Sequence, residues 1–490
     1  MDERGGYRTW GGRFEGRLHP RLARFTTSLP VDIRLLPYDL RGSLAHARML
    51  TQQRIIPGDT GTQIVAALRE MLREAEAGTF PIDADAEDVH TLIEAELHRR
   101  LGEAAGWLPT ARSRNDQVAT AFRLWVKEAC VACCGAVVDA QEALLRLAAR
   151  DGHLLLPAYT HLQRAQPVLL GHHLLAYVWM LRRDVDRLRQ ARSAADVLPL
   201  GSGAAVGVSH PVDREAVARM LGFARVSENS LDATGDRDFA VEFLGALALL
   251  MTHLSRWAGE MVLWSTEEFG FLALTDAVAT GSSIMPQKRN PDAAELIRGK
   301  WGRVIGDLVS LLGVLKGLPL GYQRDLQEDK ALVFEAADTA LDAVEAMGVI
   351  LGEARFRRER MRAALAAGFP TATEISDFLV RRGTPFRQAH ALAGQVVRYA
   401  ERQGKALTDL EPEEWSSLLP GLDAPAIEHL RAAVTPEGAV AAKDVPGGTA
   451  PGRVQAAMEQ AAREVGRLRQ WVAAAAAEEQ RVREEIRASA

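Results

Sequence analysis

Cysteine is nearly absent from the 490-residue sequence, which has only Cys130, Cys133 and Cys134, all in one short segment. An odd number at helical spacing excludes the paired framework of a small secreted disulfide protein and favours a reducing compartment. No histidine or second cysteine pair lies nearby in the sequence, so a metal site is not indicated. We interpret these residues as small core side chains.

The sequence also lacks a long apolar run and an excess of positive charge. Its longest stretch without Asp, Glu, Lys or Arg, residues 165–181, is shorter than the ~20 apolar residues that span a bilayer. Lys and Arg total 59 against 64 Asp and Glu, so no broad positive field attracts nucleic acid or anionic lipid. The first ten residues do not resemble a secretory signal or a transit peptide. We expect a cytoplasmic protein without nucleic-acid or membrane partners, in which local cations hold any anionic substrate.

Proline is missing from four long windows, residues 111–156, 168–198, 212–285 and 320–369. Because proline inside a helix removes a hydrogen bond and clashes with the preceding turn, these windows are candidate long helices. Apolar residues repeat at helical spacing in three seams: Phe243, Leu247, Leu250, Leu254, Trp257, Met261 and Trp264; Leu174, Val178, Leu181, Val185 and Leu188; and Phe334, Ala337, Leu341, Val344 and Leu351. Seams of this length need partners along their whole length, which predicts a bundle of near-parallel helices completed by other subunits.

The two ends of the chain differ from this middle part. The sequence before about residue 110 is mixed and rich in turns, and proline and glycine return after residue 369. Strand-like alternation is scarce throughout. We therefore predict an all-α fold of three domains: a mainly helical N-terminal domain over residues 1–111, a central long-helix bundle over 112–363, and a small helical C-terminal domain over 364–490. The run 454–487 is a helix former by propensity.

Polar residues that the seams do not explain cluster first in TARSRNDQVAT, residues 110–120. Arg112, Arg114 and Asn115 at the mouth of a long helix would present a guanidinium fork and amide donors to carboxylates. Ordinary capping of the helix by Ser113 or Asp116 explains the same pattern. Both interpretations stay open on these residues alone.

A second cluster is YTHLQRAQP, residues 159–167. Thr160 and His161 offer a hydroxyl and an imidazole for anchoring and proton transfer. The alternative is a structural histidine beside a proline turn, and we give His172 and His173 that structural interpretation because nothing nearby supplies a metal-ligand set.

The third cluster, TGSSIMPQKRNPD at residues 280–292, is the most informative. Gly281 and two prolines exclude a regular helix, so a loop of roughly ten residues interrupts the bundle, and such loops usually carry function. Lys288 would neutralise charge that gathers on a carboxylate, and Ser282 would accept a proton if its hydroxyl were ionised. The spacing is not that of a Walker loop.

The fourth cluster, GYQRDLQEDK at residues 321–330, opens another helical window. Tyr322, Gln327 and Lys330 would line a pocket there. A charge run at a helix start is more often a solvated surface, so these residues alone favour the simpler interpretation.

In this order and spacing, the four clusters resemble the argininosuccinate lyase family of the fumarase/aspartase superfamily, which includes the delta-crystallins. The likeness spans almost the whole chain, from WGGRF at residues 10–14, through DLRGSLAH ending at His46 and EDVHT ending at Thr91, to GGTAP at residues 447–451. GSSxMPxKxNP is specific for the superfamily, whereas SRNDQVAT and DLQEDK are specific for the argininosuccinate branch.

The resemblance implies a homotetramer in which the central helices form a twenty-helix core and each active site is assembled from three subunits. It also implies reversible cleavage of argininosuccinate into arginine and fumarate, in arginine biosynthesis, without a metal or organic cofactor. A base removes a proton from the succinyl carbon beta to the departing nitrogen, the electrons move into the neighbouring carboxylate as an aci form, and the C–N bond then breaks.

Roles carried over from the family fall on matching positions. Ser282 would be the base, Lys288 and Asn290 would stabilise the aci-carboxylate, and His161, oriented by Glu295, would assist at the departing nitrogen. The substrate-binding positions of the family correspond to Ser28, His90, Arg112, Arg114, Asn115, Thr160, Tyr322, Gln327 and Lys330.

Some residues depart from the family pattern. GKLHTG of the family is GWLPTA at residues 106–111, Gly235 replaces a serine, and Glu374 replaces an aspartate. If Pro109 reshapes the pocket, a related lyase that releases fumarate from another N-substituted aspartate is the alternative. A structural, non-catalytic role, as in delta-crystallins, is disfavoured because the proposed catalytic residues are all retained.

Overall fold

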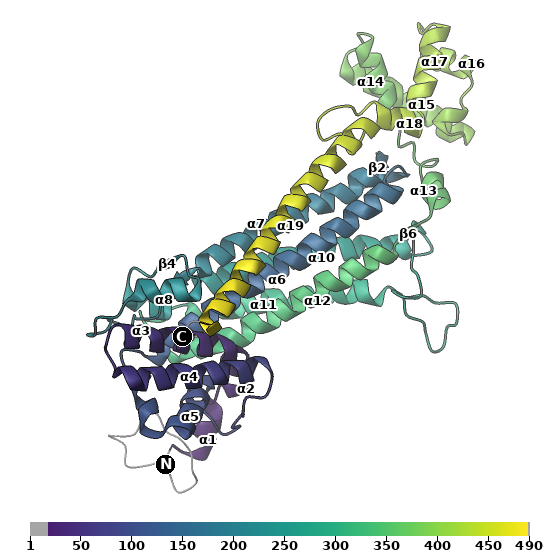
Figure 1. Ribbon diagram of the computed structural model, residues 1–490. Coiled ribbons are helices and arrows are strands. Elements are labelled where there is room, and N and C mark those ends of the chain that lie inside the picture. The colour runs from purple at the N-terminus through teal and green to yellow at the C-terminus, as the bar shows by residue number, and fades with distance from the viewer. Residues whose placement is uncertain (1–17, 489–490) are drawn as a thin grey trace.

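The computed structural model describes residues 18–488, so the WGGRF segment at residues 10–14 lies outside the described part of the chain. Long helices run side by side through the centre of the molecule, and a C-terminal helix lies along them (Figure 1). These helices are α6 (Arg114–Asp151), α7 (Leu170–Ala195), α10 (Asp238–Ser265), α11 (Asp292–Leu315), α12 (Asp329–Glu353) and α19 (Pro451–Ala488). The predicted all-α fold is confirmed. Helix α11 was not among the four predicted windows, because it lies in a shorter proline-free segment between two prolines.

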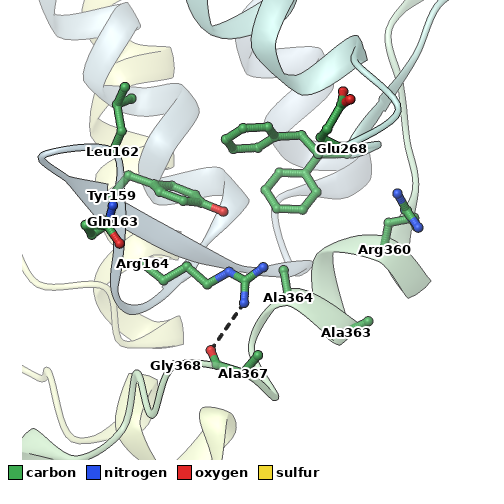
Figure 2. A pocket seen from close by; sticks show the side chains of 12 residues that line it. Tyr159, Leu162, Gln163, Arg164, Glu268, Arg360, Ala363, Ala364, Ala367 and Gly368 are labelled. Carbon is green, nitrogen blue, oxygen red and sulfur yellow. Dashed lines mark hydrogen bonds between the residues drawn. The ribbon is translucent and has the colours of Figure 1, made fainter.

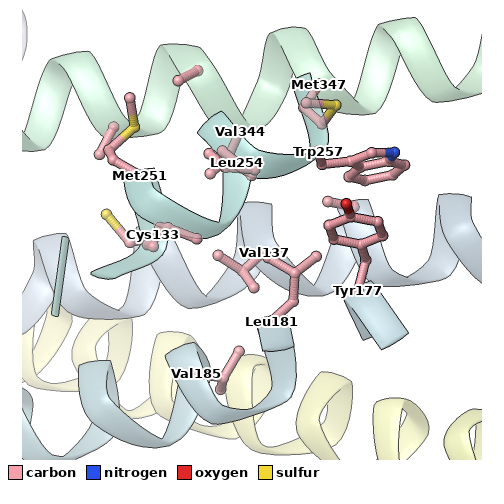
Figure 3. Packing of buried hydrophobic residues seen from close by; sticks show 14 of the residues in the cluster. Cys133, Val137, Tyr177, Leu181, Val185, Met251, Leu254, Trp257, Val344 and Met347 are labelled. Carbon is pink, nitrogen blue, oxygen red and sulfur yellow. The ribbon is translucent and has the colours of Figure 1, made fainter. Parts of the chain in front are cut away.

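The seam of α10 forms the centre of the main hydrophobic core. All seven of its seam residues are 5% exposed or less. Figure 3 shows Leu254 and Trp257 of α10 beside Val137 of α6, Leu181 of α7 and Val344 of α12. Full burial of one such side chain contributes about 1.5–3 kcal/mol, which is why helices with this spacing assemble. By length and composition α10 would also pass as a membrane span, but its buried seam accounts for that apolarity.

Cysteine is part of this core, as the sequence predicted. Cys130, Cys133 and Cys134 are buried on α6, and none forms a disulfide. Burial raises the pKa of the Cys133 thiol to about 12 and raises the pKa of the other two thiols as well. Thiols that stay protonated behave as small apolar side chains.

Two further hydrophobic clusters lie at opposite ends of the bundle (Figure 1). The N-terminal cluster is built by α2 (Leu29–Asp32), α3 (Leu36–Gln52), α4 (Gly58–Glu76), α5 (Val89–Leu101) and α8 (Arg214–Leu221). The short helix α1 (Pro20–Thr26) precedes them and has no buried residue. The C-terminal cluster is built by α14 (Thr373–Arg381), α15 (Phe386–Gln403), α16 (Pro412–Leu418) and α17 (Ala424–Ala433), followed by α18 (Pro436–Ala441).

The last helix leaves the C-terminal cluster. α19 packs along α6 and α7, and its Ile486 reaches the N-terminal cluster. The three domains with boundaries after residues 111 and 363 stay a prediction, with α19 packed on the bundle rather than among the C-terminal helices.

The strands of residues 18–488 form three two-stranded pairs, which the sequence did not predict. They are the antiparallel pair β1 (Leu155–Thr160) and β2 (Gln163–Leu169), the parallel pair β3 (Val197–Leu198) and β4 (Arg225–Val226), and the antiparallel pair β5 (Leu272–Ala273) and β6 (Arg355–Phe356). The β1–β2 hairpin turns through His161 and Leu162, whose φ angles are +56° and +57°. A two-residue turn with two positive φ angles matches the twist of the strands, but its usual Asn-Gly signature is missing here.

Candidate active site

A cavity of about 110 Å³ lies where the N-terminal helices meet the bundle. Seven residues predicted from the sequence to bind substrate line it: Ser28, His90, Arg114, Asn115, Tyr322, Gln327 and Lys330. They come from separate stretches of the chain, so tertiary packing alone brings them together. Asp32, Asp88 and Arg324 also line this cavity, which we call the N-terminal cavity.

Helix ends position most of these side chains. Ser28 precedes α2, His90 lies in the first turn of α5, Arg114 begins α6, and Lys330 lies in the first turn of α12. Helix N-termini present unpaired N–H groups and positive potential, which suits a site for carboxylates.

The start of α6 combines the two interpretations that its sequence allowed. Ser113 and Asp116 form a capping box, so the capping interpretation is confirmed. Arg114 nevertheless turns toward the N-terminal cavity, where it donates to Asp88 Oδ2 at 2.8 Å and to Thr91 Oγ1 at 2.9 Å. The first helical turn therefore contains both capping residues and residues that line the N-terminal cavity.

His90 belongs to a buried ion pair. The Nδ1 atom of the His90 ring donates to Asp39, and Gln117 donates to the same carboxylate at 2.8 Å. Burial alone would lower the pKa of His90, but the charge and hydrogen bond of Asp39 outweigh it and raise this pKa. This shift favours a protonated His90 paired with Asp39 at the wall of the N-terminal cavity.

Lys330 is held by a second buried pair. Its Nζ donates to Asp329 Oδ1 at 2.6 Å, and Arg237 binds the other oxygen of that carboxylate. Burial favours a protonated Asp329, but Lys330 and Arg237 outweigh it and lower the pKa of this carboxyl. Burial raises the pKa of the neighbouring Tyr322, which keeps its hydroxyl protonated and able to donate.

Sequence analysis missed Asp32, which is 3% exposed. The Ser28 hydroxyl donates to one oxygen of its carboxylate, whereas Oδ1 has no hydrogen-bond partner within the described residues. Burial raises the pKa of Asp32. With Asp32 and Asp88 beside Arg114 and Lys330, the N-terminal cavity offers both charges, which suits a zwitterionic ligand. The four-residue spacing between Ser28 and Asp32 was the available signal.

Arg112 does not line the N-terminal cavity. Its side chain is 2% exposed, donates to Ser43 Oγ at 2.7 Å and lies 3.9 Å from Glu94. A direct contact between Arg112 and substrate stays a prediction. The altered GWLPTA segment also lies here: Ala111 has a φ of +57°, and the carbonyl of Thr110 accepts from His46 at 2.9 Å.

Thr160 and His161 lie at the other end of the bundle, at the tip of the β1–β2 hairpin (Figure 1). The 38 residues of α6 separate this hairpin from Asn115, and a helix of that length extends about 57 Å. Both side chains belong to exposed residues. Thus one chain does not bring His161 to its own N-terminal cavity.

Ser282, Lys288 and Asn290 lie in the loop between β5 and α11, which projects from the bundle (Figure 1). Backbone hydrogen bonds between Thr280 and Asn290, at 2.8 and 3.1 Å, close the base of this loop. The Oγ atom of Ser282 accepts from the backbone N–H groups of Ile284 at 3.3 Å and Met285 at 3.1 Å. N–H groups directed at an oxygen stabilise negative charge on it.

Glu295 lies in the first turn of α11, directly after this loop, and is exposed. The 24 residues of α11 extend about 36 Å and lead away from the loop toward Tyr322. The predicted residues therefore form three groups within one chain: the N-terminal cavity, the hairpin tip and the Ser282 loop. Among residues 18–488 no cluster of His, Cys, Asp or Glu is arranged to hold a metal ion.

Comparisons with known proteins agree with this fold and these segments. The family model described as "Lyase" matches residues 12–306, and the one described as "Argininosuccinate lyase C-terminal" matches residues 369–441. An argininosuccinate lyase of Synechococcus sp. is 50% identical over 455 residues, covering 93% of this chain and 92% of its own. That of Desulforudis audaxviator is 49% identical and covers 94% and 100%. The crystal structure of EDDS lyase in complex with formate superposes with a TM-score of 0.82 at 28% identity, covering 93% of this chain and 91% of that one.

The long-helix bundle and the match over residues 12–306 define a carbon–nitrogen lyase of the fumarase/aspartase superfamily. Within that superfamily, identity near 50% over more than nine tenths of the chain is decisive. The chain belongs to the argininosuccinate lyase family.

Proposed function

We propose that the protein cleaves argininosuccinate into arginine and fumarate, in the cytoplasm, as a step of arginine biosynthesis. The observation that carries the proposal is the N-terminal cavity, where seven predicted substrate-binding residues from separate segments converge. The similar argininosuccinate lyases, which align along nearly their whole length, support the choice of substrate.

The proposed chemistry divides between the other two groups. Ser282 takes the proton from the succinyl carbon, and the backbone N–H groups that already point at its Oγ favour the ionised hydroxyl this step needs. Lys288 and Asn290 balance the charge that moves into the carboxylate. His161 acts at the nitrogen that leaves with the bonding electrons, as hydrogen-bond donor or acid.

We propose a homotetramer with shared active sites, because one chain holds the proposed catalytic residues far apart. His161 and the N-terminal cavity lie at opposite ends of α6, a separation of about 57 Å. No loop movement closes such a gap. A neighbouring subunit whose bundle runs in the opposite direction would bring its hairpin to this cavity.

The surface of α11 supports such packing. Gly299, Gly302, Gly306 and Gly313 are exposed on one face of this helix, and a Cβ atom added to any of them would meet nothing within 4 Å. Glycine inside a helix costs about 1 kcal/mol relative to alanine, and no atom of residues 18–488 requires it here. The remaining physical reason for glycine at these positions is the close approach of another subunit's backbone.

The four glycines lie on one face of α11, which we call the α11 glycine face. Apolar side chains are exposed around it. Val309 is 61% exposed, Leu312 47% and Leu296 61%, and Leu249 of the neighbouring α10 is 42% exposed. An apolar patch of this kind marks an interface. Glu295 lies on the same face at the helix start, where a neighbouring subunit's His161 would meet it.

Turnover tests the proposal directly. Purified protein given argininosuccinate is expected to release fumarate, which is followed by its ultraviolet absorbance. Ser282→Ala is expected to lose most of that activity, whereas Ser283→Ala, one residue away on the same loop, is the matched control and should retain it. A wild-type tetramer without turnover would eliminate the proposed substrate.

Mixing two inactive variants tests the shared site. Ser282→Ala and His161→Asn are each expected to be inactive, and hybrid tetramers are expected to recover part of the activity because some sites then draw both intact residues from different subunits. The control is the same mixture under conditions that prevent subunit exchange. If exchange is demonstrated and activity does not return, the three-subunit site is wrong.

A further inference from the structure

A second cavity, of about 580 Å³, lies beside the β1–β2 hairpin at the end of the bundle opposite the N-terminal cavity. One wall is the hairpin, with Tyr159 and Arg164, and the other is α13 (Arg358–Ala364) and the segment that follows it (Figure 2). The lining also includes Leu162, Gln163, Glu268, Phe269 and Phe271. We call it the hairpin cavity. Its volume lies within the range of small-molecule sites.

The hairpin register directs two polar groups into this cavity. Tyr159 and Arg164 are cross-strand partners, so their side chains lie next to each other on one face of the hairpin. Figure 2 shows the Tyr159 hydroxyl and the Arg164 guanidinium both directed into the cavity. Because successive strand residues alternate in direction, Thr160 faces the other side. Gln163, the cross-strand partner of Thr160, and Leu162 of the turn nevertheless line the cavity, so the cavity adjoins the hairpin tip.

Two arginines, Arg164 and Arg360, line the hairpin cavity, and its lining also contains one carboxyl side chain, that of Glu268. Arg164 donates to the carbonyl of Ala367 at 3.5 Å, the upper limit for a hydrogen bond, and Arg360 donates to the carbonyl of Glu267. No ion pair to either guanidinium occurs within residues 18–488. Gly270 makes room for Arg360, because a Cβ atom there would lie 2.7 Å from its Nε.

Aromatic rings provide the apolar part of the same cavity. The rings of Tyr159 and Phe269 are tilted by 48° with centroids 5.5 Å apart, and Phe269 contacts Phe271 edge to face at 5.5 Å. On the opposite wall, the small side chains of Ala363 and Ala364 leave space for a ligand. A guanidinium beside aromatic faces matches a ligand that joins a carboxylate to a flat ring.

We propose that the hairpin cavity binds a small aromatic carboxylate, whose carboxylate accepts from Arg164 and Tyr159 and whose ring packs against Phe269. Within one chain the site lies at the end of the bundle opposite the N-terminal cavity. Because one wall continues into the His161–Leu162 turn, an occupied cavity holds the hairpin against α13 and changes turnover; this second part rests on the proposed function.

Binding is measured by equilibrium dialysis of radiolabelled benzoate against the full-length protein. Benzoate has about nine non-hydrogen atoms. At the binding free energy per atom that is usual for small ligands, its Kd is about 0.1–1 mM. Benzamide, which keeps the ring and removes the charge, is expected to bind at least about tenfold more weakly, because a hydrogen bond between charged groups is lost.

Variants locate the site. Arg164→Gln is expected to weaken benzoate binding at least about tenfold, by the same lost interaction. Ala363→Leu combined with Ala367→Leu, which fills the cavity from its rim, should abolish binding. Arg358→Gln is the matched control, since it removes one positive charge from the same helix but lines a different cavity, and it should leave the Kd unchanged.

Three results would overturn the proposal: equal binding of benzoate and benzamide, unchanged binding after cavity filling, or displacement of benzoate by fumarate from Ser282→Ala protein. Displacement would assign benzoate to the catalytic site. The binding result does not depend on turnover, so failure to cleave argininosuccinate leaves it intact. With active enzyme, benzoate is expected to change kcat by about twofold or more in wild type and in Arg358→Gln, but not in the cavity-filled variant.

Discussion

Replacing Gly306 on α11 with leucine is expected to dissociate the assembly while leaving the subunit folded. Gly306 is exposed, and an added Cβ atom meets nothing within 4 Å of the same chain. Within one subunit the change removes a helix-interior glycine, which stabilises α11 by about 0.8 kcal/mol. The isolated subunit should therefore become slightly more stable.

Between subunits the effect has the opposite sign. If another backbone packs on the α11 glycine face, a leucine side chain overpacks it, and overpacking costs about 1–3 kcal/mol per site. A homotetramer contains the substitution four times, so the total is about 4–12 kcal/mol per tetramer, before relaxation. Because each active site needs several subunits, activity should fall together with the tetramer.

Sedimentation velocity measures the oligomer, urea unfolding of the dissociated species measures the subunit, and fumarate release measures activity. Gly466→Leu on α19 is the matched control, since this glycine is also exposed in a helix interior and its Cβ atom would meet nothing. Unlike the α11 glycine face, α19 has no exposed large apolar side chain among its described residues. It should keep both tetramer and activity. A Gly306→Leu protein that remains a fully active tetramer would refute the packing of α11 on a second copy.

Three further predictions concern the surroundings of the N-terminal cavity. Ala111→Gly should raise the free energy of unfolding by about 1 kcal/mol in urea denaturation, because alanine is strained at a φ of +57°. Burial, with a smaller effect of a nearby arginine, lowers the pKa of His46 from 6.5 to about 3. Between these values the unfolded chain binds a proton that the folded chain does not, so the free energy of unfolding should fall by about 2 kcal/mol from pH 6.5 to about 4.5. His46→Gln, which keeps a donor for Thr110, should flatten that slope. Asp329→Asn should destabilise the fold by about 3–5 kcal/mol in thermal unfolding, because Arg237 stays buried with an uncompensated charge.

The long helices other than α11 could be predicted from the sequence because their signals are local. Proline-free windows and helical spacing identify the segments, and the spacing of Phe243 to Trp264 already specifies the face that is buried. The hairpin could not be predicted. Its turn uses His161 and Leu162 at positive φ, and its short strands are stabilised by packing against α13 rather than by strand propensity.

The candidate site, too, could be predicted from the sequence only in part. Motifs recognised in the sequence named Ser28, His90, Asn115 and Lys330 without showing that they meet, and packing of the N-terminal helices on the bundle brings them to one cavity. Asp32 was missed because nothing in the sequence shows that its second oxygen lacks a partner.

The sequence by itself determined the helical class, the family and the residues able to carry the chemistry, because periodicity and motif spacing act over a few turns of chain. Tertiary structure decided which residues share a cavity and which are separated by the length of α6. It also revealed the α11 glycine face, where no atom of the described residues requires glycine. Contacts between distant segments depend on the packing of whole helices, and that packing is set by shape and burial over the entire molecule.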